Sequence, residues 1–521
     1  MEITVLNSTF PVLTLLVLLP ALAALALWLI KPTRIAARQI GLAVSTLVLL
    51  GTIYLALNFD YGKAAAYQFA ETHSWIRALG VSWALGVNGL GLAMLVLSAL
   101  LTLIVLIASA RDLEGENKPY DDAGYVGLTL ATLAFMMLIF AARDVFVFYL
   151  AFEAMLVPMF FLIGRYGNGA KRKAAAMKFL LYSLAGGLVM LIGIVGIYVY
   201  SPLAAASNEQ HASLYLIENL AGKLQASPGV EMALMISFFI AFAVKAPMVP
   251  VHTWLADTAE NARPGTSALL VGILDKIGTF GMITLCLTIF PNASRRAALA
   301  FIILAVISVI WGSLAALAQK DLMRLISFTS VAHFGLMVLG IYVGNTVALA
   351  GAMVYMVAHG LSIAGMFLIG GFLTERGHSQ DIEAYGGMQR VTPLIAGTFL
   401  ISGLAAIALP GLSGFVPELM VLIGTFRLYQ WAAALCLVGV VAGAVYVLLP
   451  YQKIFTGKAP EHRKSIKDLD NRERWGVVAP LIVLMLVIGL HPQPLVDPMS
   501  QVAQKVIVTQ DVAFQVEGTG K

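Results

Sequence analysis

Charged residues are scarce in this sequence. Only 12% of its 521 residues are Asp, Glu, Lys or Arg, whereas hydrophobic residues make up 60%. Soluble domains average about a quarter charged residues, so this chain has too few polar side chains to cover several soluble domains. The mean hydropathy of +0.88 points the same way. Together these values predict a polytopic helical membrane protein.

Cysteine and the common cofactor motifs are also nearly absent. The two cysteines, Cys286 and Cys436, both fall within hydrophobic runs. They form no CxxC pair, no Cys/His cluster with metal-ligand spacing and no plausible disulfide framework. The sequence has no GxxxxGK[ST] followed by a helix, and no HExxH. We therefore expect no flavin, haem, iron–sulfur, nucleotide or metal site on this chain.

Long hydrophobic runs divide the sequence. About 14 of them approach the roughly 20 residues that a helix needs to cross a bilayer core about 30 Å thick. They are 10–30, 38–57, 87–109, 124–141, 145–164, 175–200, 232–254, 264–289, 297–318, 323–342, 346–373, 392–425, 430–451 and 476–494. The first is not expected to be a cleaved signal, because its flank MEITVLN is acidic and has no basic region. The sequence predicts an all-α integral membrane protein with about 14 transmembrane helices.

Basic residues are distributed unevenly between the loops. Loops after odd-numbered spans hold 22 of the 33 Lys and Arg residues, the other side with the termini holds nine, and Lys245 and Lys276 lie inside spans. The positive-inside rule then places the more basic loops in the cytoplasm and both termini outside. The pI near 9.0 is therefore interpreted as a sign of topology and not of a nucleic-acid-binding surface.

Two predicted spans contain helix-breaking residues. AVKAPMVPVHTW carries Pro247 and Pro250, and AIALPGLSGFVPELM carries Pro410 and Gly411. Proline removes a backbone donor and clashes with the preceding turn, and the freed carbonyls need partners from protein or a water-filled cavity. Paired interruptions in two halves of a chain indicate an inverted-repeat transporter. Ordinary proline kinks are the alternative interpretation.

Ionisable residues lie deep in several predicted spans. A charge at the bilayer centre costs at least roughly 2.5–3.5 kcal/mol on insertion scales, so such residues are candidates for function by default. The main candidates for ion translocation are Glu153, Lys245, Lys276, His359 and Glu418, with His252, His333 and Asp275 as auxiliary candidates.

Each candidate also has a structural interpretation. Glu153 could belong to a fixed ion pair, the lysines could snorkel to the interface, and a lone histidine could pack with one hydrogen bond. Asp275 could neutralise Lys276, but neighbouring helix residues point about 100° apart. Taken together, the set is what a proton or cation relay needs. The pKa of a lysine rises when a carboxylate is nearby, and a histidine titrates near neutrality.

The segments around these residues resemble a known family, the antiporter-like membrane subunits that respiratory complex I shares with Mrp-type sodium/proton antiporters. The similar segments are AQKDLMRLISFTSVAHFGLM, KAPMVPVHTWLADTAENARPGTSALLVGILDKIGTFGM, MVAHGLSIAGMFLIGG and LPGLSGFVPELMVLIGTF. The resemblance covers essentially the whole chain, with an antiporter-like core at 125–430. One departure lies beside the central lysine, where Asp275 stands at a position that is frequently leucine in the family.

The resemblance implies an architecture and a role for each candidate. It implies one membrane domain over 1–521, with two inverted repeats of five helices at about 125–289 and 297–451, each with a broken helix. Glu153 and Lys245 would be the family's Glu–Lys pair, Lys276 its central lysine, His359 a connecting histidine and Glu418 the end of the charged axis. NuoL- and NuoN-type subunits usually carry lysine where this chain has Glu418, so the resemblance favours a third subunit type.

The function implied is proton translocation in an NADH:quinone oxidoreductase of a prokaryotic cytoplasmic membrane, driven by quinone reduction elsewhere in the complex. Flavin, iron–sulfur clusters and quinone would then belong to partner subunits, and NuoL-like and NuoN-like subunits would be neighbours. A subunit of an Mrp-type cation/proton antiporter, or of the membrane arm of a related hydrogenase complex, is the alternative. A third reading is a membrane scaffold whose charges are fixed ion pairs.

Overall fold

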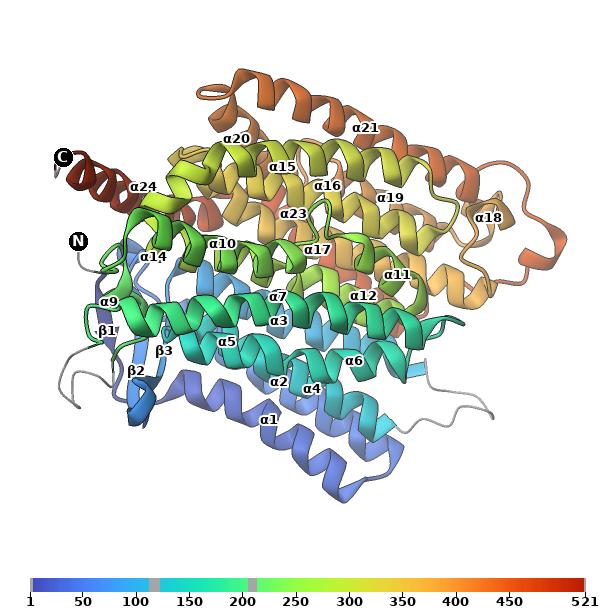
Figure 1. The fold of residues 1–521 in the computed structure, drawn as a ribbon. Coiled ribbons are helices and arrows are strands. Elements are labelled where there is room, and N and C mark those ends of the chain that lie inside the picture. The colour runs from blue at the N-terminus through green and yellow to red at the C-terminus, as the bar shows by residue number, and fades with distance from the viewer. Residues whose placement is uncertain (1–2, 112–121, 205–212, 520–521) are drawn as a thin grey trace.

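The computed structural model describes residues 3–111, 122–204 and 213–519. In this part of the chain, helices run side by side and form one elongated bundle (Figure 1). Thirteen helical segments are long and apolar enough to cross a membrane. The shorter α19 (Pro393–Ala406) and α20 (Phe415–Phe426) follow each other and take the place of one more span. The prediction of an all-α membrane protein with about 14 spans is confirmed.

The helices follow the predicted spans closely. Those of the first half are α1 (Val12–Ile30), α2 (Arg34–Leu57), α3 (Gly89–Ala108), α4 (Asp122–Ala141), α5 (Val145–Ala154), α6 (Leu156–Gly164), α7 (Arg172–Tyr200), α10 (Pro228–Lys245), α11 (Thr253–Asn261), α12 (Pro264–Leu269), α13 (Lys276–Gly281) and α14 (Leu287–Ile289). Those of the second half are α15 (Pro291–Leu317), α16 (Leu322–Tyr342), α17 (Thr346–Gly377), α19, α20, α21 (Gln430–Phe455) and α23 (Ala479–Leu490). Helix α24 (Gln493–Thr519) follows the last predicted span.

Local sequence signals account for many helix starts. Helices α10, α12, α15 and α19 each begin at a proline, whose missing N–H is one that a first helical turn leaves unpaired in any case. Other helices begin after a side-chain cap. The carboxylate of Asp144 accepts from the first turn of α5, and the amide oxygen of Asn345 accepts from the first turn of α17.

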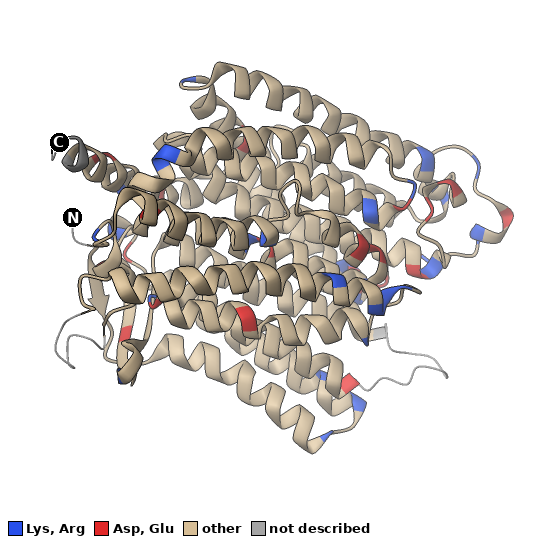
Figure 2. Ribbon diagram, in the orientation of Figure 1, with Lys and Arg blue, Asp and Glu red and all other residues tan. Residues whose placement is uncertain are grey.

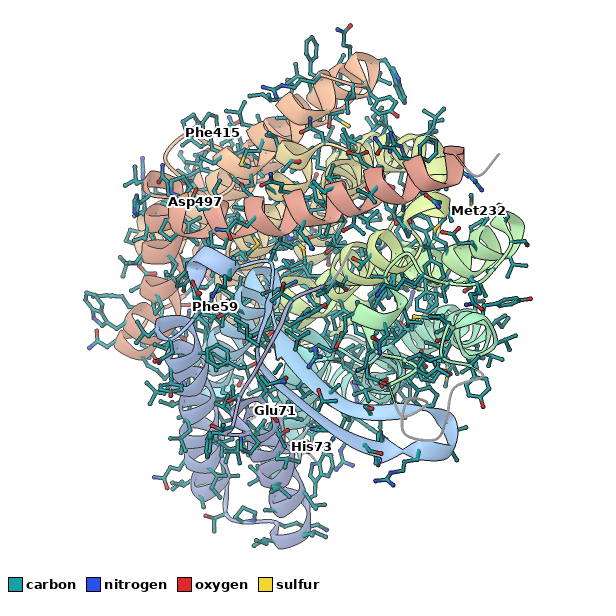
Figure 3. All side chains as sticks on the ribbon, turned by 90° about the vertical axis from the view of Figure 1, so that its left-hand side faces the viewer. Phe59, Glu71, His73, Met232, Phe415 and Asp497 are labelled. Atoms are coloured by element: carbon teal, nitrogen blue, oxygen red, sulfur yellow. The ribbon has the colours of Figure 1, made fainter. Side chains whose placement is uncertain are left out.

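A small β-sheet closes the end of the bundle where both termini lie (Figure 1). Strand β2 (Tyr67–Ile76) pairs with β1 (Val5–Asn7) in parallel and with β3 (Val81–Val87) in antiparallel orientation. Figure 3 shows this end face on, with the β2 residues Glu71 and His73 on the hairpin and α24 lying across the other helices. The sequence analysis predicted no sheet, because β2 and β3 lie in a polar interruption between two spans.

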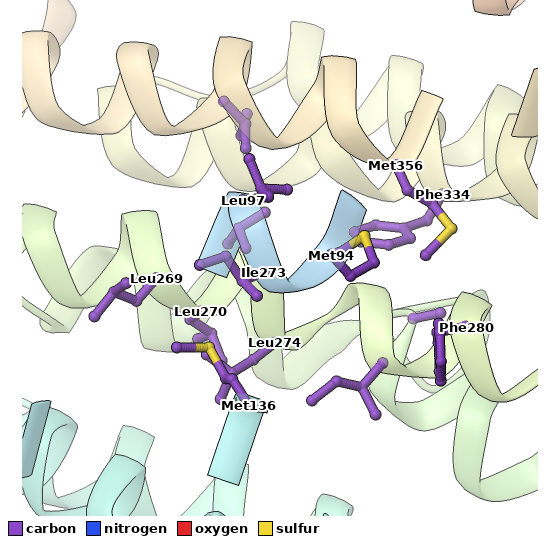
Figure 4. Packing of buried hydrophobic residues seen from close by; sticks show 14 of the residues in the cluster. Met94, Leu97, Met136, Leu269, Leu270, Ile273, Leu274, Phe280, Phe334 and Met356 are labelled. Carbon is purple, nitrogen blue, oxygen red and sulfur yellow. The ribbon is translucent and has the colours of Figure 1, made fainter. Parts of the chain in front are cut away.

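Two spans lie at the centre of the bundle. The 18-residue apolar windows of 264–289 and of α17 are entirely buried, whereas only 33–39% of the windows of α1, α2, α7 and α21 is buried. Around the first central span, Leu270 and Leu274 lie beside Met136 of α4 (Figure 4), and the ring of Phe280 packs against that of Phe140. Polar groups on these central spans are therefore screened from lipid by a complete shell of other helices.

Basic side chains gather at the end of the bundle opposite the termini (Figure 2). This asymmetry matches the uneven count of Lys and Arg between the loops. Inside the bundle, charged residues are few and scattered over separate helices (Figure 2). The charged groups in the interior therefore stand out against an almost wholly apolar background.

Candidate functional site

The first helix break begins at Lys245. Helix α10 ends at this residue, and the chain leaves the helical path through Pro247 and Pro250 before α11 starts at Thr253. Lys245 thus occupies the C-terminal end of α10, where the helix dipole favours a cation by about 0.3–1 kcal/mol at exposed sites. The break explains why a lysine can be accommodated at this depth.

Protein groups satisfy the backbone atoms that this break frees. The carbonyl of Val244 accepts a hydrogen bond from Trp254 Nε1 at 3.0 Å. The N–H of Val249 donates to Ser308 Oγ at 3.0 Å. Irregular backbone inside a membrane is tolerated only where protein or water supplies such partners, and here both come from side chains of the bundle.

The second break separates α19 from α20. Pro410 and Gly411 lie between the two helices, and Gly411 has a φ of +90°, which glycine adopts without strain. Glu418 then lies in the first turn of α20, where the helix dipole favours an anion. Each break therefore puts an ionisable residue at the helix end whose dipole suits its charge.

Glu153 lies on α5 and faces α7. A Cβ placed on Gly187 of α7 would lie 1.5 Å from Glu153 Oε1, so only glycine leaves room for the carboxylate in this position. Oε1 has no hydrogen-bond partner among the residues that the structure describes. The space left by Gly187 therefore accommodates the carboxylate, and no hydrogen bond from a described residue holds Oε1.

Lys245 is fully buried, and its ammonium is surrounded by aromatic rings. Nζ lies 5.1 Å from the ring centroid of Phe179 and 5.8 Å from that of Phe152, and it has no hydrogen-bond partner in the described chain. Glu153 attracts it electrostatically without touching it. Glu153 and Lys245 therefore interact through space without forming an ion pair, and the strength of that interaction depends on their separation. Their role as the family's Glu–Lys pair stays a prediction.

Lys276 lies on the short helix α13, between two π-helical segments at Leu270–Leu274 and Met282–Cys286. Single-turn π segments within α-helices are frequent at functional sites. Lys276 Nζ donates to the carbonyl of Val271 at 2.8 Å and contacts His359 Nδ1 at 3.0 Å. The lysine is thus connected directly to α17.

His359 begins a cluster of rings in the second half. Its ring centroid lies 5.1 Å from that of His333 on α16 and 6.4 Å from that of Tyr355 on α17. Tyr355 Oη donates to Glu418 Oε2 at 2.8 Å. The cluster therefore continues from Lys276 to the carboxylate at the second break.

The sequence analysis missed Tyr355 and Tyr446. Tyr446 of α21 is buried, and its hydroxyl lies 3.2 Å from His333 Nε2. For Tyr355 a signal was present, because it stands four residues before His359 and so shares a helix face with it. No comparable signal exists for Tyr446, which lies 113 residues from its partner.

Asp275 is buried beside Lys276, and neither of its oxygens has a hydrogen-bond partner in the described chain. His252 is placed differently. Its Nε2 accepts from Trp311 Nε1 at 3.1 Å, and its ring packs near Phe328 at 6.1 Å between centroids. Within the described part of the chain, His252 therefore contacts Trp311 and Phe328 and none of the other candidates.

An ion-pair network holds α11 at the end of the bundle opposite the termini. Asp257 accepts from Lys178 Nζ at 2.7 Å and from Arg324 Nη1 at 2.8 Å, and Arg324 also reaches Glu260 at 2.8 Å. Burial alone would raise the pKa of Asp257, but the hydrogen bonds from Lys178 and Arg324 outweigh it and lower this pKa. The network ties α7 and α16 to α11, which lies between the membrane-spanning helices 228–245 and 264–289.

Titratable groups therefore succeed one another through the interior of the bundle. They run from the half-buried Glu153 and the buried Lys245 through Asp275 and Lys276 to His359, His333, Tyr355 and Glu418. Each can hold or release a proton or a hydrogen bond. An arrangement of this kind can carry protons along the membrane plane.

Comparisons with known proteins identify the chain's relatives. The family model described as NADH:quinone oxidoreductase/Mrp antiporter, transmembrane, matches residues 142–443. A relative called NADH-quinone oxidoreductase subunit M from Mycobacterium tuberculosis (strain H37Rv) is 41% identical and covers 96% of this chain and 95% of its own. The protein of the same name from Rickettsia prowazekii (strain Madrid E) is 34% identical, covering 94% and 96%.

Solved structures with similar folds belong to respiratory assemblies and antiporters. A chain of respiratory complex I from Thermus thermophilus superposes with a TM-score of 0.83 at 30% identity, covering 95% of this chain and 99% of that one. A chain of the Mrp complex from Dietzia sp. DQ12-45-1b gives a TM-score of 0.79 at 22% identity, covering 96% and 98%. At that identity, the second similarity concerns the fold alone.

Proposed function

Because the chain belongs to the NADH:quinone oxidoreductase/Mrp antiporter family of transmembrane subunits, we propose that it translocates protons as the M-type subunit of an NADH:quinone oxidoreductase. The observation that carries the proposal is the succession of buried titratable groups between the two helix breaks. Structural charges in a membrane would be expected in direct ion pairs. Here Lys245, Glu153 and Asp275 keep unpartnered polar atoms.

The proposed mechanism begins at the first break. A lysine holds its proton more tightly when a carboxylate approaches, and less tightly when it is desolvated alone. Glu153 and Lys245 are close enough to interact but are not bonded, so a change in their separation switches Lys245 between holding and releasing a proton. Lys276, His359 and Glu418 then receive the proton in turn.

The free energy for this movement comes from outside the chain. The sequence has no motif for a flavin, iron–sulfur cluster or nucleotide, so redox chemistry is assigned to partner subunits, which hold flavin, iron–sulfur clusters and quinone. The relatives named above are subunits of an oxidoreductase, and NuoL-like and NuoN-like chains are the proposed neighbours in the membrane arm. The basic loops support a cytoplasmic-membrane protein with both termini outside.

An Mrp-type cation/proton antiporter subunit is the alternative function, with the membrane arm of a related hydrogenase complex as a further possibility. The fold similarity to an Mrp chain supports the architecture that both share. The identity to NADH-quinone oxidoreductase subunits M is markedly higher and extends over nearly the whole chain, which favours the oxidoreductase.

The first experiment replaces Lys245 by alanine in the native membrane. Assembly of the complex is checked on a native gel, and NADH:quinone turnover and proton uptake are then measured on the same vesicles. Lys223→Ala is the matched control, because Lys223 is an exposed lysine near the end of the bundle that carries the termini. We expect an assembled complex in which turnover and proton uptake both fall strongly, with the control unchanged.

Three other results would contradict the proposal. Normal turnover and pumping in the Lys245→Ala variant would make the lysine structural. Unchanged NADH oxidation together with loss of sodium/proton exchange would assign the chain to an antiporter. If every charge-neutralising variant of the candidate residues abolished assembly, the charges would belong to a structural scaffold.

A further inference from the structure

Asp275 is the buried carboxylate for which the family resemblance provides no role. It is fully buried, at the joint between the π-helical segment Leu270–Leu274 and α13. Both carboxylate oxygens lack a hydrogen-bond partner among the described residues. An unpartnered buried carboxylate is costly unless nearby cations or proton uptake compensate it, and leucine, frequent here in the family, would avoid this cost.

The backbone packing shows which way this face of α13 points. Gly278 lies three residues after Asp275 and therefore on the same side of the helix. A Cβ on Gly278 would lie 2.5 Å from the carbonyl oxygen of Phe242 and 2.7 Å from the N of Ala246. This side of α13 is thus in backbone contact with the end of α10, directly beside Lys245.

Lys276 points in another direction. Its ammonium reaches the carbonyl of Val271 and the ring of His359, as expected for a residue rotated by about 100° from its neighbour. Asp275 interacts electrostatically with both Lys245 and Lys276 but forms an ion pair with neither. The carboxylate therefore lies between the lysine of the first break and the lysine that contacts α17.

Few other titratable groups face this position. Among the elements packed against α13, the buried titratable groups are Lys245 on α10, His333 and Tyr342 on α16, Cys286 in the π segment Met282–Cys286, and Asp122 and Tyr125 in the first turn of α4. Helix α4 and the segment Leu270–Leu274 present apolar side chains such as Met136 and Leu274 (Figure 4). Proton exchange by Asp275 is therefore directed toward the two lysines.

We propose that Asp275 is a proton-carrying residue between Lys245 and Lys276. The inference rests on the proposed function. The Lys245 ammonium gives a proton to the carboxylate, which leaves a neutral amine and a carboxylic acid. The acid then gives its proton to the neutral amine of Lys276, and the carboxylate is restored. The open oxygens suit this role, because a fixed counterion would be bonded to one lysine.

The test compares three substitutions at this position in the intact complex. Asp275→Asn keeps the shape but cannot take up a proton, Asp275→Leu introduces the residue frequent in the family, and Asp275→Glu keeps the carboxyl group. Assembly, NADH:quinone turnover and proton uptake are measured across the neutral pH range. We expect Asn and Leu to lower coupled turnover and pumping at least about tenfold at every pH, and Glu to restore most of both.

Two results would overturn the assignment. If the Asn variant kept the maximal rate and only its pH dependence moved, Asp275 would be a fixed counterion that tunes Lys276. If the Leu variant were fully active, protons would pass between the lysines without the carboxylate. The Lys245→Ala variant runs in parallel. If Lys245→Ala is inactive and the Asp275 variants are active, only the proposed role of Asp275 is wrong. If Lys245→Ala and the Asp275 variants are all active, the proposed function is contradicted as well.

Discussion

The ammonium of Lys276 and the imidazole of His359 meet at 3.0 Å, where α13 approaches α17. When Lys276 is an ammonium that donates to Nδ1, the ring proton of a neutral His359 must be on Nε2. That nitrogen has no hydrogen-bond partner in the described chain, and the ring faces those of His333 and Tyr355. Among the residues that the structure describes, this contact is the direct hydrogen bond between Lys276 of α13 and the second half.

Replacing His359 by glutamine tests this connection. Glutamine retains hydrogen-bonding groups for Lys276 but cannot titrate, so proton uptake and coupled turnover are expected to fall at least about tenfold, equivalent to about 1.4 kcal/mol. Both are measured on vesicles after assembly is verified. His73→Gln, on the exposed part of β2, is the control. Full pumping by the His359 variant would show that its ring is only a packing residue.

Tyr355→Phe removes one hydroxyl and leaves the ring in place. The lost hydrogen bond to Glu418 is of the kind worth about 1.5–3 kcal/mol when the partner is charged, so we expect a clear drop in pumping without loss of assembly. Tyr446→Phe should have a smaller effect, because its partner is a histidine at 3.2 Å. If both variants were as active as wild type, the two tyrosines would not be part of the proton pathway.

Gly187→Ala is expected to disturb Glu153 specifically. The new methyl group would occupy the position of Oε1, so the carboxylate must turn away and its interaction with Lys245 must change. We expect reduced turnover in an assembled complex. Gly397→Ala on α19 is a matched control, because a Cβ there meets no atom within 4 Å. Similar behaviour of the two variants would show that the position of Glu153 is unimportant.

Trp254→Phe is expected to destabilise the structure around the first helix break. It removes the donor to the Val244 carbonyl, and a buried carbonyl left without a partner costs about 1–3 kcal/mol. The measurement is the thermal stability of the purified complex, followed by native gel. Trp431→Phe, at a largely exposed position on α21, should change little. An unaltered melting temperature for the Trp254 variant would mean that another group replaces the indole.

Asp257→Asn tests the ion-pair network by its pH dependence. Because the pKa of Asp257 is lowered in the folded protein, its stabilisation is present above its ordinary pKa near 4 and is lost as the pH falls through the lowered value. The variant should therefore be less stable than wild type at neutral pH, with the difference shrinking on acidification. Thermal unfolding at several pH values measures this. A constant difference would point to packing rather than charge.

The sequence by itself determined where the membrane helices lie and where they break. Lipid offers no hydrogen bonds, so spans must be long, apolar and helical, and the spans predicted from hydropathy coincide with the helices observed. The same physics makes an ionisable residue in a span conspicuous, which is why Glu153, Lys245, Lys276, His359 and Glu418 could be named in advance. The β2–β3 hairpin was not predicted, because β2 is rich in polar residues and β3 directly precedes a hydrophobic span.

Only the tertiary structure decided which of these residues meet. Contacts such as Tyr355 with Glu418 and Tyr446 with His333 join helices far apart in the sequence, and hydropathy contains no information on helix rotation. The same holds for Asp275, whose side of α13 became clear from the backbone contact of Gly278 with α10. Helix packing therefore determines which groups lie next to each buried charge, because the rotation of a helix about its axis depends on all the helices around it.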